Sequence, residues 1–114
     1  MKLAPMMTKR HRPGVYECTH AVVDSVKILV GVDLSPILLS RVLSWRHRLI
    51  EMEARPAWNE LALVMFRRRG GGDHIGLWHQ GRVAHLNALG FFIQPLPQLV
   101  AQGWDGVRFF KWDK

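Results

Sequence analysis

Apolar residues near the start of the chain recur at helical spacing. One stripe of them consists of Val22, Val26, Leu29 and Val30. Gly31 follows this stripe, and glycine often ends a helix because it tolerates the left-handed backbone conformation. The pattern therefore predicts a helix over 18–30, with Cys18 in its first turn or at its N-terminal cap.

A second helix is predicted to begin at Ser35, a residue type that caps helix N-termini, with Pro36 at the first helical position. Its apolar face would consist of Ile37, Leu38, Val42, Leu43 and Leu49. We expect this helix to run to about Met52, and Pro56 to close it.

After Pro56 the spacing of apolar residues changes from helical to strand-like. Short apolar or alternating runs predict five strands, at 61–66, 74–79, 82–86, 91–93 and 107–112. Gln80 and Gly81 are expected to form a tight hairpin turn, and 95–102 a short helical turn. Helices followed by antiparallel strands predict an α+β fold, with N-terminal helices packed on a small antiparallel sheet.

The length of 114 residues leaves room for one domain. We expect a basic N-terminal arm over 1–12 and a single compact domain over 13–114. The first residues contain neither the apolar segment nor the cleavage site of a signal peptide. We therefore expect that the protein has no signal peptide and is synthesised in the cytoplasm. No run reaches the ~18 apolar residues that a membrane-spanning helix requires.

Charge and cysteine content narrow the function classes further. The formal net charge is +7, which favours polyanionic partners such as a cell-wall polymer or nucleic acid. A single cysteine excludes an intramolecular disulfide and with it the class of disulfide-stabilised small domains.

Cys18 and two histidines form a candidate catalytic group. The thiolate is the nucleophile in cysteine chemistry, and a helix N-terminus or a nearby histidine lowers the pKa of a thiol. His74 opens one strand of the predicted hairpin and His85 lies on its partner, and cross-strand neighbours on one face can touch. His85 could thus orient His74, and His74 could deprotonate Cys18. Backbone N–H groups at the helix N-terminus would stabilise an oxyanion.

The same residues allow other interpretations. A single cysteine in a small domain is often an inert buried side chain. A metal site would draw on five candidate ligands, Cys18, His20, His74, His79 and His85. The spacing contains no close ligand pair of the C-x-x-C or H-E-x-x-H type, so we expect no metal.

The arginine–glycine run and the tryptophans are further candidates for binding. The run 67–73 contains three arginines and three glycines and is expected to be a solvated loop, and its composition would also suit contacts to phosphate groups or nucleic acid. Trp58, Trp104 and Trp112 are assigned to the core, whereas Trp45 and Trp78 could line a groove.

Several segments together resemble the NlpC-type family of cell-wall cysteine peptidases. The segment 16–23 is similar to the start of that family's catalytic helix, where an acidic residue precedes the cysteine. The runs LVMF (63–66), DHIGLW (73–78) and GRVAH (81–85) resemble its strand, its histidine strand and the strand that follows. The ending 104–110 is similar to that of short phage-encoded members, so the resemblance spans 13–112.

The resemblance implies a papain-like fold and a catalytic triad. Cys18 would be the nucleophile, His74 the general base and acid, and His85 the orienting residue. The family's substrates are peptidoglycan stem peptides, cut at a bond between a γ-D-glutamyl group and a diamino acid, with no cofactor. Phage relatives are associated with the phage tail, which implies tail proteins as partners and action on the cell wall from a virion.

The chain departs from the family pattern after the cysteine, where Thr19 and His20 replace the usual Ser or Trp followed by Gly. This departure leaves one alternative open, a catalytically inactive papain-like module that serves as a structural or wall-binding tail component. A basic nucleic-acid-binding protein is the second alternative, and it rests on the net charge alone.

Overall fold

The computed structural model describes residues 2–39, 49–68 and 72–112. Its helical elements are η1 (Ala4–Thr8, a 3-10 helix), α1 (Cys18–Val30), α2 (Ser35–Leu38) and α3 (Leu96–Ala101). Its strands are β1 (Leu49–Glu51), β2 (Ala62–Arg68), β3 (Asp73–His79), β4 (Arg82–Asn87), β5 (Gly90–Gln94) and β6 (Trp104–Trp112). The fold is therefore α+β, as predicted.

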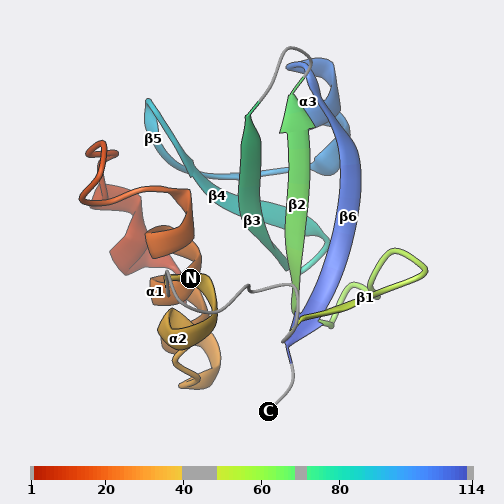
Figure 1. Ribbon diagram of the computed structural model, residues 1–114, viewed down its shortest axis with the longest axis horizontal. Coiled ribbons are helices and arrows are strands. Elements are labelled where there is room, and N and C mark those ends of the chain that lie inside the picture. Colours follow the sequence, from red (N-terminus) through yellow and green to blue (C-terminus); the bar gives the residue numbers. More distant parts are fainter. Residues whose placement is uncertain (1, 40–48, 69–71, 113–114) are drawn as a thin grey trace.

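The strands form one sheet in the order β1-β6-β2-β3-β4-β5, and every neighbouring pair is antiparallel. The N-terminal helix α1 packs on β3 and β4, with α2 beside it, whereas α3 lies by β6 at the other side (Figure 1). The predicted order of N-terminal helices followed by an antiparallel sheet is confirmed.

Apolar residues fill both faces of the sheet. One cluster lies between the sheet and the N-terminal elements and includes Leu3, Met6, Val22, Val26, Leu63, Leu77 and Leu86. A second cluster lies on the opposite face against α3 and includes Val64, Phe66, Trp78, Val83, Leu96 and Leu99. Because β2 is covered on both faces, its sequence is a continuous apolar run rather than an alternating one.

The first helix has the ends that its sequence predicts. At the N-terminus the Glu17 side chain accepts a hydrogen bond from the backbone of His20, and the Glu17 N–H donates to His20 Nδ1 at 3.0 Å. Such a reciprocal cap satisfies two N–H groups that have no partner within a helix. At the C-terminus Gly31 adopts a φ of 72°, which glycine reaches without strain.

The second predicted helix is wrong in its C-terminal part. The α2 helix ends at Leu38, and 40–48 lies outside the described residues. Leu49, which we expected on the helix, instead begins β1 and pairs with Trp112 of β6. The free edge of β6 offers hydrogen bonds to this segment, so pairing between distant parts of the chain overrides the local helical pattern.

The N-terminal segment differs from the expected separate arm, because Leu3 and Met6 are completely buried in the first core cluster. The loop expected over 67–73 is also shorter at both ends. Arg67 and Arg68 belong to β2 and Asp73 begins β3, while 69–71 lies outside the described residues.

Candidate active site

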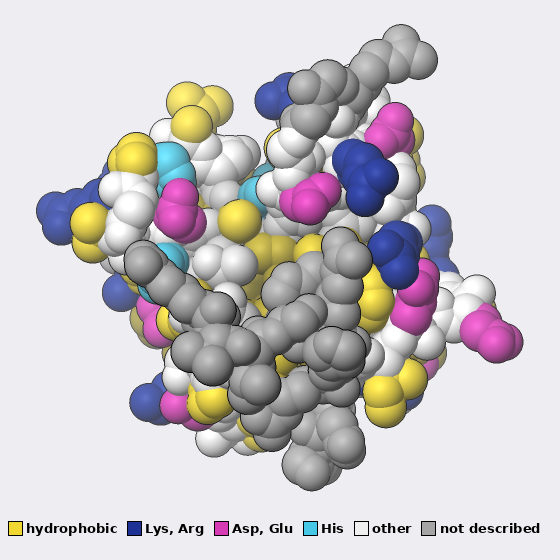
Figure 2. Space-filling view, in the orientation of Figure 1, with side chains coloured by type: hydrophobic (Ala, Val, Ile, Leu, Met, Phe, Trp, Pro, Cys, Tyr) yellow, Lys and Arg dark blue, Asp and Glu magenta, His cyan; other side chains and the backbone are white. Residues whose placement is uncertain are grey.

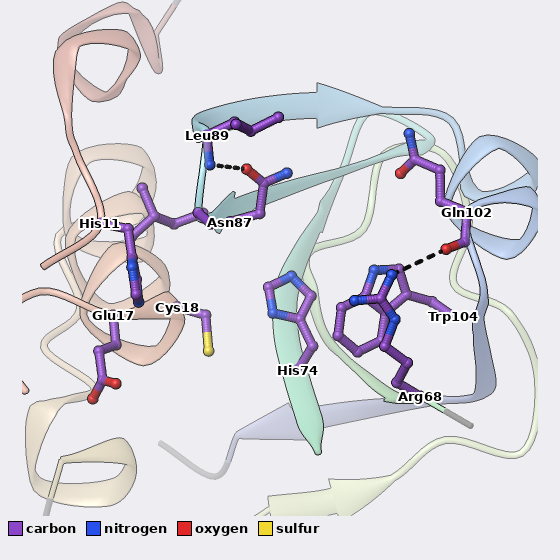
Figure 3. A pocket seen from close by; sticks show the side chains of 11 residues that line it. His11, Glu17, Cys18, Arg68, His74, Asn87, Leu89, Gln102 and Trp104 are labelled. Carbon is purple, nitrogen blue, oxygen red and sulfur yellow. Dashed lines mark hydrogen bonds between the residues drawn. The ribbon is translucent and has the colours of Figure 1, made fainter. Parts of the chain in front are cut away.

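Cys18 and His74 line the same two cavities. Cys18 is the first residue of α1, and His74 lies near the start of β3. The larger cavity has a volume of about 660 Å³ and the smaller about 180 Å³, and both residues contribute to each. Figure 3 shows the two side chains on neighbouring elements across the larger cavity. In the space-filling view, histidine side chains are visible at separate places on this face (Figure 2).

His74 belongs to a chain of hydrogen bonds that crosses three strands. Its Nε2 lies 2.8 Å from Nδ1 of His85 on β4, and Nε2 of His85 lies 2.6 Å from Oε1 of Gln94 on β5. His74 and His85 are 7% and 1% exposed, so the hydrogen bond between them is shielded from solvent, whereas Gln94 is partly exposed. Because Nε2 of His74 is engaged with His85, Nδ1 is the ring nitrogen that could accept a proton from Cys18.

The surroundings of His74 favour a neutral ring. Burial, together with the charge of a protonated His85, lowers the pKa of His74 from 6.5 to about 4. Burial also lowers the pKa of His85. The His74 ring stacks on Trp104 with centroids 4.8 Å apart and meets the His85 ring edge-on. A neutral, firmly held imidazole is in the state that a general base requires.

The thiol of Cys18 is protonated in this resting arrangement. Burial raises its pKa and the charge of Glu17 adds to the rise, whereas the backbone N–H groups of Ile75, Thr19 and Cys18 itself oppose it. Among the described residues no hydrogen bond joins the thiol to His74. Catalytic hydrogen bonds are often long in unliganded sites, and rotation about the Cα–Cβ bond of Cys18 moves the sulfur.

The residue two positions after the cysteine has a structural role. His20 accepts the hydrogen bond from the Glu17 N–H that caps α1, and its ring stacks on Tyr16 with centroids 5.8 Å apart. The Tyr16 hydroxyl in turn donates to Asp24 Oδ2 at 2.7 Å. His20 therefore stabilises the N-terminus of the helix that carries Cys18, and it does not line either cavity.

One wall of the larger cavity carries an arginine held over an aromatic ring. The Arg68 guanidinium lies 5.0 Å from the Trp104 ring centroid and donates to the Gln102 carbonyl at 3.4 Å (Figure 3). Arg67 and Arg108, by contrast, form ion pairs with Asp73 and Glu51. Among the described residues no carboxylate pairs with Arg68, so its charge is available to a ligand.

The structure brings His74 and His85 into direct contact and places Cys18 beside the cavity that His74 lines. The assignment of the tryptophans is wrong for two residues, because Trp78 is only 4% exposed and Trp58 is 65% exposed. Trp104 packs against the second core cluster, as expected, and it also lines the larger cavity. Trp45 lies outside the described residues.

Sequence reasoning missed Gln94 altogether, since no motif marks a glutamine at the end of a strand. Of the metal ligands considered, His79 lies at the far end of β3 from His74. The described residues contain no group of three or more histidine, cysteine or acidic side chains placed to hold a metal ion.

Comparisons with known proteins leave the family open. No family model, no curated protein and no solved structure matches this chain. No helix in the described part of the chain has the length and apolar character needed to cross a membrane.

Proposed function

We propose that the protein is a cysteine peptidase or amidase with a papain-like fold of the NlpC type. Its substrates would be peptidoglycan stem peptides, cleaved between a γ-D-glutamyl group and a diamino acid. The observation that carries the proposal is that Cys18, at a helix N-terminus, shares a cavity with His74, which is hydrogen-bonded to His85. These are the nucleophile, base and orienting residue of a triad.

The reaction would begin when Nδ1 of His74 takes the proton of the Cys18 thiol and the sulfur attacks the carbonyl carbon of the substrate. The backbone N–H groups at the start of α1 would stabilise the oxyanion of the tetrahedral intermediate. Collapse of this intermediate breaks the C–N bond, and His74 returns its proton to the leaving amine. Water, deprotonated by His74, then hydrolyses the thioester and frees the Cys18 thiol.

The charge of the cavity supports a substrate that bears carboxylates. The Arg68 guanidinium lies on one wall, while the Glu17 carboxylate accepts a hydrogen bond in the cap of α1. Stem peptides carry free carboxylates on their acidic and diamino acid residues. Arginine suits such groups because its planar fork can donate two parallel hydrogen bonds.

The resemblance to short phage-encoded members supports association with a phage or prophage tail. In that setting the tail delivers the protein to the cell wall, and its partners are tail proteins. Figure 2 shows Lys and Arg side chains spread around the visible face rather than gathered in one patch, so the charge distribution on that face does not favour a nucleic-acid interface.

The proposal is tested by incubating the protein with purified peptidoglycan and measuring soluble fragments by liquid chromatography and mass spectrometry. We expect release by the wild type and none by Cys18→Ala or His74→Ala. His79→Ala is the matched control, since it removes a histidine from the opposite end of the same strand and should retain activity. Full release by Cys18→Ala would overturn the proposed mechanism.

A non-catalytic wall-binding module of the same fold is the second candidate. It is favoured by the raised pKa of the Cys18 thiol and by the lack of a hydrogen bond between that thiol and His74 among the described residues. Sedimentation with insoluble peptidoglycan distinguishes the two. A binding module would sediment with the wall, release no fragments, and bind equally well as Cys18→Ala.

A further inference from the structure

We propose that Gln94 sets the tautomer of His74 and thereby selects the ring nitrogen that is free to accept a proton from Cys18. The inference rests on the proposed function for its catalytic meaning, but the tautomer itself can be measured without any activity. Gln94 does not touch the reacting atoms, so its role is that of a positioning residue.

The geometry connects the three side chains in one line. Gln94, His85 and His74 lie on the adjacent strands β5, β4 and β3, with hydrogen-bond distances of 2.6 Å and 2.8 Å. Val83 pairs with Gln94 and Phe92 with His85, so the bond from Gln94 to His85 runs diagonally between the two strands. In the described part of the chain every buried side-chain nitrogen and oxygen has a hydrogen-bond partner.

The donors and acceptors along this line follow from the chemistry of the amide. The Oε1 of Gln94 can only accept, so Nε2 of His85 must donate. A neutral imidazole has one N–H, so Nδ1 of His85 is then an acceptor. Nε2 of His74 must therefore donate to it, and Nδ1 of His74 keeps its lone pair.

The opposite orientation of the Gln94 amide would reverse every step. An amide N–H donating to Nε2 of His85 would put the His85 proton on Nδ1. Nε2 of His74 would then have to accept, and the proton of His74 would sit on Nδ1, facing the cavity. If Nδ1 of His74 already carries a proton, it cannot accept one from Cys18. The orientation of the Gln94 amide therefore decides whether His74 can act as a base toward Cys18.

The experiment is nitrogen NMR of the imidazole rings in uniformly labelled protein at pH 9, where both rings are neutral. For the wild type we expect the proton on Nε2 of both His74 and His85. Gln94→Leu removes the acceptor and should give a mixture of tautomers in both rings. Gln94→Glu supplies an end group that only accepts and should retain the wild-type tautomer. Gln98→Leu, an exposed glutamine on α3, is the control and should change nothing.

A His74 proton on Nδ1 in the wild type, or unchanged tautomers in Gln94→Leu, would overturn the inference. If Gln94→Leu fails to fold, a reversed tautomer in Gln94→Glu would overturn it instead. In peptide hydrolysis we expect Gln94→Leu to lower kcat roughly tenfold at unchanged KM, with Gln94→Glu close to wild type at pH 9. Wild-type protein with the expected tautomers but no hydrolysis would refute the proposed function and leave the role of Gln94 intact.

Discussion

Gly76 lies so close to His85 that a side chain at this position would collide with it. A Cβ built on Gly76 would be 3.2 Å from the Cβ of His85, 3.1 Å from the Ala84 carbonyl oxygen and 2.7 Å from Cγ1 of Val83. Leu77 pairs with Ala84, so Gly76 and His85 face each other across β3 and β4. Because Gly76 has no side chain, His85 has room to place its ring diagonally against His74.

We therefore expect Gly76→Ala to separate the two histidines. The added methyl forces β3 and β4 apart or moves the His85 ring, and overpacking of this kind costs about 1–3 kcal/mol. Urea unfolding should show that loss of stability, and nitrogen NMR should show the loss of the single tautomer at His74. Unchanged unfolding and an unchanged His74 signal would contradict this explanation of the glycine.

The two histidines should differ in how much they contribute to turnover. In the proposed mechanism His74 transfers protons directly, so His74→Ala should lower kcat by at least about 100-fold. In the same mechanism His85 only orients this base, so His85→Ala should lower kcat less, about tenfold, because a water molecule could replace part of the His85 ring. Steady-state hydrolysis of a purified stem peptide measures both. A larger loss for His85→Ala than for His74→Ala would reverse the assigned roles.

Stability should fall as the solution is acidified, because His74 resists protonation in the folded state. The unfolded chain binds a proton with a pKa near 6.5, whereas the folded pKa is about 4. Between these values the proton stabilises only the unfolded state, so the free energy of unfolding falls by up to about 3 kcal/mol between pH 7 and pH 4. Urea titrations at both values measure the loss, and His74→Gln should reduce it. An equal loss in His74→Gln would assign the effect to other groups.

Arg68 should contribute to substrate binding rather than to the chemical step. Arg68→Ala is expected to raise KM about tenfold for a stem peptide with free carboxylates, at little change in kcat, which corresponds to about 1.4 kcal/mol. Arg67→Ala is the control, because Arg67 is the preceding residue on β2 and already pairs with Asp73 at 3.7 Å. A stem peptide with amidated carboxylates should be insensitive to Arg68→Ala. Equal effects of both variants on KM would contradict a specific role for Arg68.

The parts of the fold that depend on local pattern could be predicted from the sequence. The helix that begins at Cys18 has a regular stripe and a glycine stop, and the His74–His85 hairpin has a two-residue turn in which Gln80 and Gly81 adopt φ values of 51° and 74°. Such turns are strongly specified by residue type. The contact between the two histidines followed from this hairpin because its register decides which side chains share a face.

The parts that depend on pairing between distant segments could not be predicted. The strand β1 forms because β6 offers an edge, and Arg68 meets Trp104 because these residues pair across β2 and β6. The register of that pair shifts between Met65 and Arg67, and such an irregularity redirects the side chains that follow it. Gln94 reaches His85 only through the β4–β5 register. The pattern of apolar and polar residues along the sequence does not determine which distant strands pair or in which register.

The proposed mechanism requires that the Cys18 sulfur forms a covalent acyl intermediate with the substrate. Rapid mixing of the protein with a purified stem peptide, acid quenching and mass spectrometry of the Cys18-containing fragment measure this intermediate directly. We expect this fragment to gain the mass of the acyl portion of the peptide at early times and to lose it as hydrolysis proceeds. The proposed intermediate would be contradicted if the peptide were cleaved while Cys18 stayed unmodified at every quench time, and if cleavage continued in Cys18→Ala.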